Sequence, residues 1–150
     1  MVVTVVGITA SLGVAQWRGA KDTAEARAAA KTAASLVTTA RMLAQSRRSF
    51  VKVNAVTTGR GSIVLQECHK AFGDYSTGGC TYTDLDQTRM TMGADDYSTL
   101  TLQNVSGGPI VFTPLGLGDS SNADMVLSFV SRGGNNSRTT VSAQGLAIAN

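Results

Sequence analysis

Residues 1–17 read MVVTVVGITASLGVAQW and carry no charged side chain; the first charge is Arg18. A helix of this length spans about 25 Å, slightly less than the roughly 30 Å hydrocarbon core of a bilayer. A secretory signal peptide begins with basic residues, whereas this apolar run starts at Met1. We interpret the stretch as a membrane helix whose beginning is missing. The alternative is a buried helix or strand of a globular domain.

A helical pattern continues from Arg18 to about Val53. Many alanines between Ala24 and Ala34 favour a helix. Apolar residues recur every three or four positions in one stripe, which comprises Ala26, Ala29, Ala30, Ala33, Leu36, Val37, Ala40, Leu43, Ala44, Phe50 and Val51. A helix from Val2 to Val53 would be about 75 Å long, too long for a globule of this size to bury. Its first half is therefore expected to project into a membrane or into other subunits.

The middle of this helix, from Gly13 to Thr23, is expected to bend or to restart. Asp22-Thr23-Ala24-Glu25 has the pattern of a capping box, which is typical of a helix N-terminus. Gly19 lies just before that pattern, at a position where a break would be tolerated.

The rest of the chain is expected to form a β-rich head. Short alternating or apolar runs between glycine-rich turns predict strands at Ser62–Gln66, Thr88–Met92, Ser98–Val105, Ile110–Phe112, Met125–Val130, Arg138–Ser142 and Leu146–Ile148. The fold class is α+β, with a long N-terminal helix, apolar in its first half, packed on a small antiparallel sheet. Residues 1–21 then form a membrane or filament-core segment. Residues 22–150 form the head, with an amphipathic helix over 22–53 and strands within 60–150.

The two cysteines, Cys68 and Cys80, lie in a stretch rich in glycine, serine and threonine. In an exported protein this pattern predicts one disulfide that closes a short loop. Two free thiols, as in a cytosolic protein, are the alternative. His69 is the only histidine, so no cluster has the spacing of a zinc site.

The sequence predicts no enzyme, metal site, cofactor or small-molecule substrate. Cys68 and His69 are adjacent in sequence, and neighbouring side chains rarely face each other as nucleophile and base. The aspartates at Asp84, Asp86, Asp95 and Asp96 are typical of solvated turns rather than of a calcium loop.

Basic residues gather near the predicted end of the helix, at Arg47, Arg48 and Lys52. Cations are favourable there because the helix dipole is negative at its C-terminus. The alternative is a phosphate-binding patch for DNA, joined by Arg132 and Arg138. No aromatic residues are interleaved with these arginines to stack on bases, and the net charge of +3 is mild.

Four stretches together resemble the type IV pilin superfamily, and within it the GspH/FimT-type minor pilins (pseudopilins). Met1–Ile8 is similar to the interior of the apolar pilin helix, and Ala40–Ser49 is similar to the "AR..A..R" run late in that helix. Ile110–Gly116 resembles the "I.F.P.G" strand and turn, and Arg138–Gly145 resembles the final "R.V.VS..G" strand. By this alignment the family's Phe-Thr-Leu-x-Glu-Leu segment, with the processing glycine before it, is absent from the start.

The sequence departs from the family at two places. Ala15 and Gln16 stand about where the family often has a proline. Some members bind DNA through a C-terminal Gly-Arg-x-Arg motif, but the matching run, Gly145–Ile148, has no arginine. That difference weakens an assignment to DNA uptake.

The resemblance implies a minor pilin or pseudopilin: a structural subunit of a type IV pilus or of a type II secretion pseudopilus, acting in assembly priming or at the tip. Its partners would be other major and minor pilins, through the N-terminal helix, and the bacterial inner membrane before assembly. It would cross that membrane once with its head in the periplasm, then enter an extracellular pilus or a periplasmic pseudopilus. The residues expected to pack in the filament are Val2, Val5, Val6, Ile8, Leu12 and Val14. The alternative function is a DNA-binding minor pilin for natural transformation.

Overall fold

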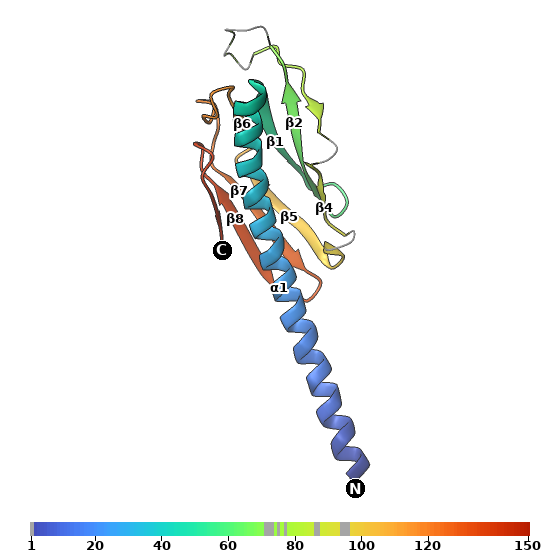
Figure 1. Cartoon of the computed structure of the whole chain (residues 1–150). Coiled ribbons are helices and arrows are strands. Elements are labelled where there is room, and N and C mark those ends of the chain that lie inside the picture. Colours follow the sequence, from blue (N-terminus) through green and yellow to red (C-terminus); the bar gives the residue numbers. More distant parts are fainter. Residues whose placement is uncertain (1, 71–73, 75, 77, 86–87, 94–96) are drawn as a thin grey trace.

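A computed structural model describes residues 2–70, 74, 76, 78–85, 88–93 and 97–150, with side chains from residue 17 onward except that of residue 104. One helix, α1 (Val2–Arg47), runs along one side of a head made of strands, and its N-terminal part extends beyond that head (Figure 1). At 1.5 Å per residue, α1 is about 69 Å long. The predicted architecture of a long helix packed on antiparallel strands is confirmed.

The helix is continuous, so the predicted restart at Asp22 is wrong. Asp22 and Glu25 lie inside the helix, where the backbone N–H groups already have intrahelical partners and no capping box forms. Gly19 is helical as well, and a helical glycine costs only about 1 kcal/mol relative to alanine. The neighbouring alanines offset that cost because they favour the helical backbone.

The predicted end of the helix at Val53 is also wrong, since α1 ends at Arg47 and a strand begins three residues later. Arg48 adopts a left-handed backbone conformation with φ of 51°, and Ser49 N–H donates to the Ala44 carbonyl (3.2 Å). This is the usual geometry by which a helix terminates. Phe50 continues the helical spacing, but the aromatic and β-branched residues that follow favour a strand.

In the described part of the chain, nine strands form two antiparallel sheets, both beside α1. The first sheet has the order β3-β2-β1-β6, with β4 also paired to β2, and comprises β1 (Phe50–Val56), β2 (Ser62–Cys68), β3 (Thr83–Asp84), β4 (Met90–Thr91) and β6 (Ile110–Phe112). The second has the order β5-β7-β8-β9 and comprises β5 (Leu100–Ser106), β7 (Met125–Ser131), β8 (Asn136–Val141) and β9 (Ala147–Ala149). The structure confirms six of the seven predicted strands almost in full. The predicted strand Thr88–Met92 is reduced to β4, and β1 and β3 were not predicted.

The helix contributes an alanine-rich face to the core. Its buried positions are Ala26, Ala29, Ala30, Ala33, Val37, Ala40 and Ala44, all at most 1% exposed. Such small side chains allow the helix backbone to approach the sheets closely. The approach is close enough that the buried Thr139 hydroxyl on β8 donates to the Ala30 carbonyl (2.8 Å). Larger side chains from both sheets, led by Phe112 and Phe129, fill the remaining space.

Candidate functional site

The end of α1 is tied to β2 through a nearly buried carboxylate, Glu67. Its Oε1 accepts a hydrogen bond from the Ser49 hydroxyl (2.6 Å), and its Oε2 pairs with the Arg47 guanidinium (2.8 Å). His69 Nε2 lies 3.3 Å from Oε1. Burial by itself would raise the pKa of Glu67, but the hydrogen bonds from Ser49 and Arg47 and the charges of His69 and Arg47 hold it below its ordinary value. Glu67 therefore stays ionised. Its ion-pair partner, Arg47, is one of the arginines predicted to contact DNA.

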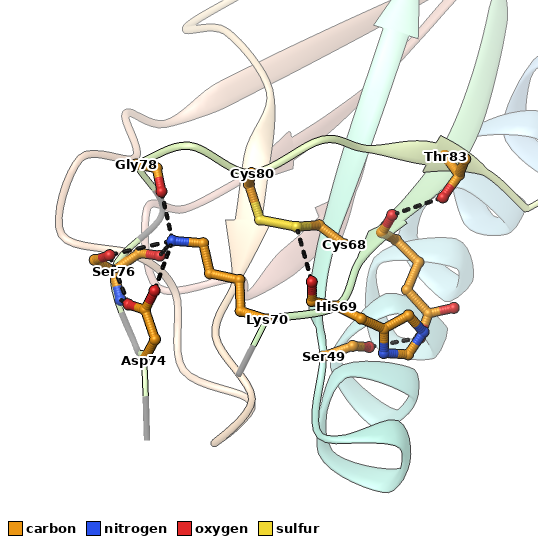
Figure 2. The surroundings of a disulfide bond; sticks show 10 residues. Ser49, Cys68, His69, Lys70, Asp74, Ser76, Gly78, Cys80 and Thr83 are labelled. Carbon is orange, nitrogen blue, oxygen red and sulfur yellow. Dashed lines mark hydrogen bonds and ion pairs between the residues drawn. A yellow bond between two sulfur atoms is a disulfide. The ribbon is translucent and has the colours of Figure 1, made fainter. Parts of the chain in front are cut away.

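The predicted disulfide joins Cys68 to Cys80 directly after this cluster, with an S–S distance of 2.08 Å (Figure 2). Because its sulfur is in that bond, Cys68 cannot act as a nucleophile beside His69. The bond closes the loop that follows β2 onto the segment leading into β3.

Lys70 holds the disulfide loop together by hydrogen bonds to several of its residues. Its side chain is 12% exposed, and its Nζ bonds to Asp74 Oδ2 (3.2 Å) and to the Ser76 and Gly78 carbonyls (Figure 2). Hydrogen bonds from the Ser76 hydroxyl and N–H, and then from Lys70, lower the pKa of Asp74 to about 2. Lys70 is therefore a structural clamp for this loop.

The basic residues predicted as a DNA patch lie on separate parts of the head. Arg47 and Arg48 lie at the end of α1, and Lys52, on β1, stacks over the Tyr82 ring at 4.2 Å. Arg132 follows β7 at the opposite end of the head. The turn that it begins is located there by Asn135, whose Nδ2 donates to the Gly19 carbonyl (3.4 Å). Gly19 is 28 residues before Arg47, about 42 Å along the helix axis.

Arg138 lies between these two groups, in the middle of β8. Its neighbour Thr139 bonds to the Ala30 carbonyl, which places Arg138 some 25 Å along the axis from Arg47. The structure thus brings Arg47, Arg48 and Lys52 together at one end and leaves Arg132 and Arg138 elsewhere.

Two residues important to the head were missed in the sequence. Glu67 lies next to Cys68, and the alternation of its strand gave no reason to expect a buried charge. Arg60 stands between Gly59 and Gly61 in the turn from β1 to β2, and its guanidinium donates to the Ser98 carbonyl far along the chain. Neither contact has a local signal, because each depends on how distant segments pack.

The residues expected to pack in the filament, Val2, Val5, Val6, Ile8, Leu12 and Val14, all belong to α1, but their side chains lie outside the described part of the structure. Within the described residues, no helical segment has the length and hydropathy of a bilayer span. Three of the aspartates considered for calcium, Asp86, Asp95 and Asp96, also lie outside the described residues.

Large exposed apolar side chains mark the surface of the head and the start of its contact with α1. They are Trp17, Met42, Val56, Leu115, Leu117, Leu146 and Ile148. Leu115 lies against the end of α1, because its carbonyl accepts a hydrogen bond from Gln45 (3.1 Å). Trp17 is 72% exposed on α1, just before the first contact with the head at Gly19.

Neither a protein-family model nor a curated protein matches this sequence. The structure is similar to the crystal structure of the type IV minor pilin FimU of Pseudomonas aeruginosa strain PAO1, with a TM-score of 0.54. The sequence identity is 16%, and the match covers 84% of this chain and 88% of that chain. The likeness shows that this chain has the type IV pilin fold, as the sequence resemblance predicted.

Proposed function

From the type IV pilin fold, we propose that this protein is a minor pilin or pseudopilin, a structural subunit of a type IV pilus or of a type II secretion pseudopilus. The observation that carries the proposal is the part of α1 that extends beyond the head (Figure 1). Among the described residues, the first hydrogen bond from α1 to the β7–β8 turn is at Gly19, and the residues before it correspond to about 25 Å of helix. Before Arg18 this segment has no charged residue, and such a surface is stable only when lipid or other protein covers it.

In a minor pilin, lipid covers this surface before assembly, and other subunits cover it in the filament. Before assembly the projecting helix would lie in the bacterial inner membrane with the head in the periplasm, where a disulfide such as Cys68–Cys80 persists. In the filament the same helix would pack against other major and minor pilins through its apolar residues. A role in priming or at the tip, and membership of the GspH/FimT-type group, are part of this proposal. Such a role needs no catalytic group, cofactor or small-molecule substrate.

DNA capture for transformation is the less favoured function. Arg47 is paired with Glu67, and Lys52 is stacked on Tyr82, so two of the three basic residues at the helix end already have partners in the head. Arg132 is at the opposite end of the head, which leaves no continuous track for a DNA backbone among the predicted contact residues.

The proposal is tested by placing a charge in the projecting helix. We expect Val6→Arg to remove the protein from filaments sheared off its host, because a buried arginine in an apolar helix costs about 3 kcal/mol. Val6→Leu is the matched control and should be incorporated like the wild type. The amount of the chain in the filament fraction and in the membrane fraction is measured by immunoblotting.

Two results would contradict the minor-pilin proposal. One is wild-type incorporation of the Val6→Arg variant. The other is absence of the wild-type chain from both the filament and the membrane fraction while the disulfide-bonded head is present in the cell.

A further inference from the structure

A polar cavity of about 410 Å³ lies at the end of the head from which α1 projects. Its lining includes two arginines and four hydroxyl side chains: Arg60, Arg132, Ser98, Thr99, Thr101 and Ser131. None of the lining residues that the structure describes is acidic. A cavity with two guanidinium groups and several hydroxyl donors has the chemistry of an oxyanion site.

The two arginines lie in loops of different sheets, and both contact the segment Ser98–Thr99. Arg60 belongs to the β1–β2 turn, and its guanidinium donates to the Ser98 carbonyl. Arg132 directly follows β7, and its N–H donates to the carbonyl of Thr99, the next residue (3.0 Å). The Arg60 carbonyl also accepts from Leu102 N–H (2.8 Å), which fixes the turn to β5. These hydrogen bonds fix the backbone at both arginines and the guanidinium of Arg60.

The nearby carboxylate of Glu25 is already engaged. It accepts hydrogen bonds from the hydroxyl and the N–H of Thr99 on the helix side of that segment. The cavity opens instead on the outer side of the second sheet, where Thr101 and Val130 lie opposite each other in the register. An anion in the cavity would therefore meet the two arginines and the side chains of Ser98, Thr101 and Ser131.

The position of the cavity identifies the source of the anion. The turn that carries Arg132 touches α1 at Gly19 and lies against Asp22, whose Oδ2 is 2.6 Å from the place of a Cβ on Gly133. Trp17 is five residues before Asp22, about 7.5 Å along the helix axis. A tryptophan at the end of an uncharged run is typical of the membrane–water interface, where lipid phosphates lie. The β7–β8 turn, which carries Arg132, is thus within about one Debye length of that level along the helix axis.

We propose that the cavity between Arg60 and Arg132 binds the phosphate of an anionic lipid headgroup and seats the head on the membrane before assembly. The inference rests on the proposed function, because only a chain anchored by α1 would hold the cavity at the lipid surface. Arg18 and Lys21 are exposed on α1 at about this level and add positive charge there, beside the carboxylate of Asp22. A nucleic acid would have to reach the end of the head nearest the membrane, which makes it the less suitable ligand.

The test compares the affinity of the full chain for vesicles of neutral phosphatidylcholine with its affinity for vesicles that also contain phosphatidylglycerol. The ratio of the two affinities removes the contribution of helix insertion, which both vesicles share. We expect Arg132→Gln and Arg60→Gln each to lower the ratio about fivefold, the effect of one basic residue at an anionic surface. Arg48→Gln is the matched control, because Arg48 is exposed at the far end of the head and should leave the ratio unchanged.

The outcomes separate this inference from the proposed function. Equal ratios for the wild type and both cavity variants, with strong binding to neutral vesicles, would overturn the headgroup site and leave the membrane-anchored subunit intact. No binding of the wild type to either vesicle would contradict the anchored function itself. If Arg132→Gln instead weakens binding of duplex DNA or of inorganic phosphate and leaves the vesicle ratio unchanged, the cavity serves a soluble anion and the lipid assignment is wrong. A lowered ratio for both cavity variants alone supports it.

Discussion

Replacing Glu67 by glutamine is expected to lower the free energy of unfolding of the head by about 2 kcal/mol. The Glu67 side chain is 6% exposed and accepts one hydrogen bond from Ser49 (2.6 Å) and one from Arg47 (2.8 Å). A hydrogen bond to a charged group contributes about 1.5–3 kcal/mol. The Arg47 bond contributes less than that because its side chain is 49% exposed, and glutamine keeps one acceptor for Ser49. The net loss of unfolding free energy is therefore about that of one hydrogen bond to a charged group.

Urea unfolding of the full chain in a mild non-ionic detergent, followed by circular dichroism, measures this loss. Asp84→Asn is the matched control, because Asp84 pairs with Arg89 (2.9 Å) with both side chains more than a third exposed. An exposed pair of this kind contributes about 1 kcal/mol at most. If Glu67→Gln costs no more than Asp84→Asn, then the buried cluster does not stabilise the end of the helix in the way described.

The stability lost in Glu67→Gln is also expected to depend on pH. The folded head holds the pKa of Glu67 below its ordinary value of 4.5, so the unfolded chain binds the proton more readily. The stability that Glu67 contributes is fully present above that ordinary value and is lost as the pH falls through the folded pKa. We therefore expect the difference in unfolding free energy between wild type and Glu67→Gln to be constant near neutral pH and to shrink in acid. A difference that stays constant until the protein unfolds in acid would contradict this assignment.

Two further predictions concern the rest of the head. Gly145→Ala should destabilise it by about 2–4 kcal/mol, because Gly145 has φ of 79° and an added Cβ would lie 2.2 Å from Phe112 Cε1 in the core. Gly134→Ala, with φ of 82° but open space around it, should cost only about 1 kcal/mol, and equal costs in urea unfolding would exclude the steric explanation. Reduction of the Cys68–Cys80 bond should lower the unfolding free energy by roughly 2–4 kcal/mol. Matched unfolding curves with and without reductant measure this loss, and coincident curves would show that the loop is held by Lys70 and its neighbours alone.

The errors in the prediction of α1 come from local signals that tertiary packing overrides. The sequence at Asp22 has the capping-box pattern, but the helix continues without a break on both sides of it, so no helix terminus forms there. The stripe at Phe50 and Val51 fits a helix as well as a strand, since both residues are buried in either case. Pairing with β2 over seven positions decided the outcome in favour of β1.

Local sequence patterns were sufficient to predict the long helix, most of the strands and the cysteine pair. Helical periodicity, alternation and turn residues are local properties, and the uncharged run before Arg18 is visible without any structure. Packing between distant segments sets the division of the strands into two sheets and buries Glu67 against the end of the helix. It also brings the loops of Arg60 and Arg132 to the same segment, Ser98–Thr99. These features depend on contacts between segments far apart in the chain, which packing and sheet register set, and no local pattern encodes such contacts. The projecting helix remains the feature on which the proposed function rests, and the fold added the polar cavity at its exit from the head.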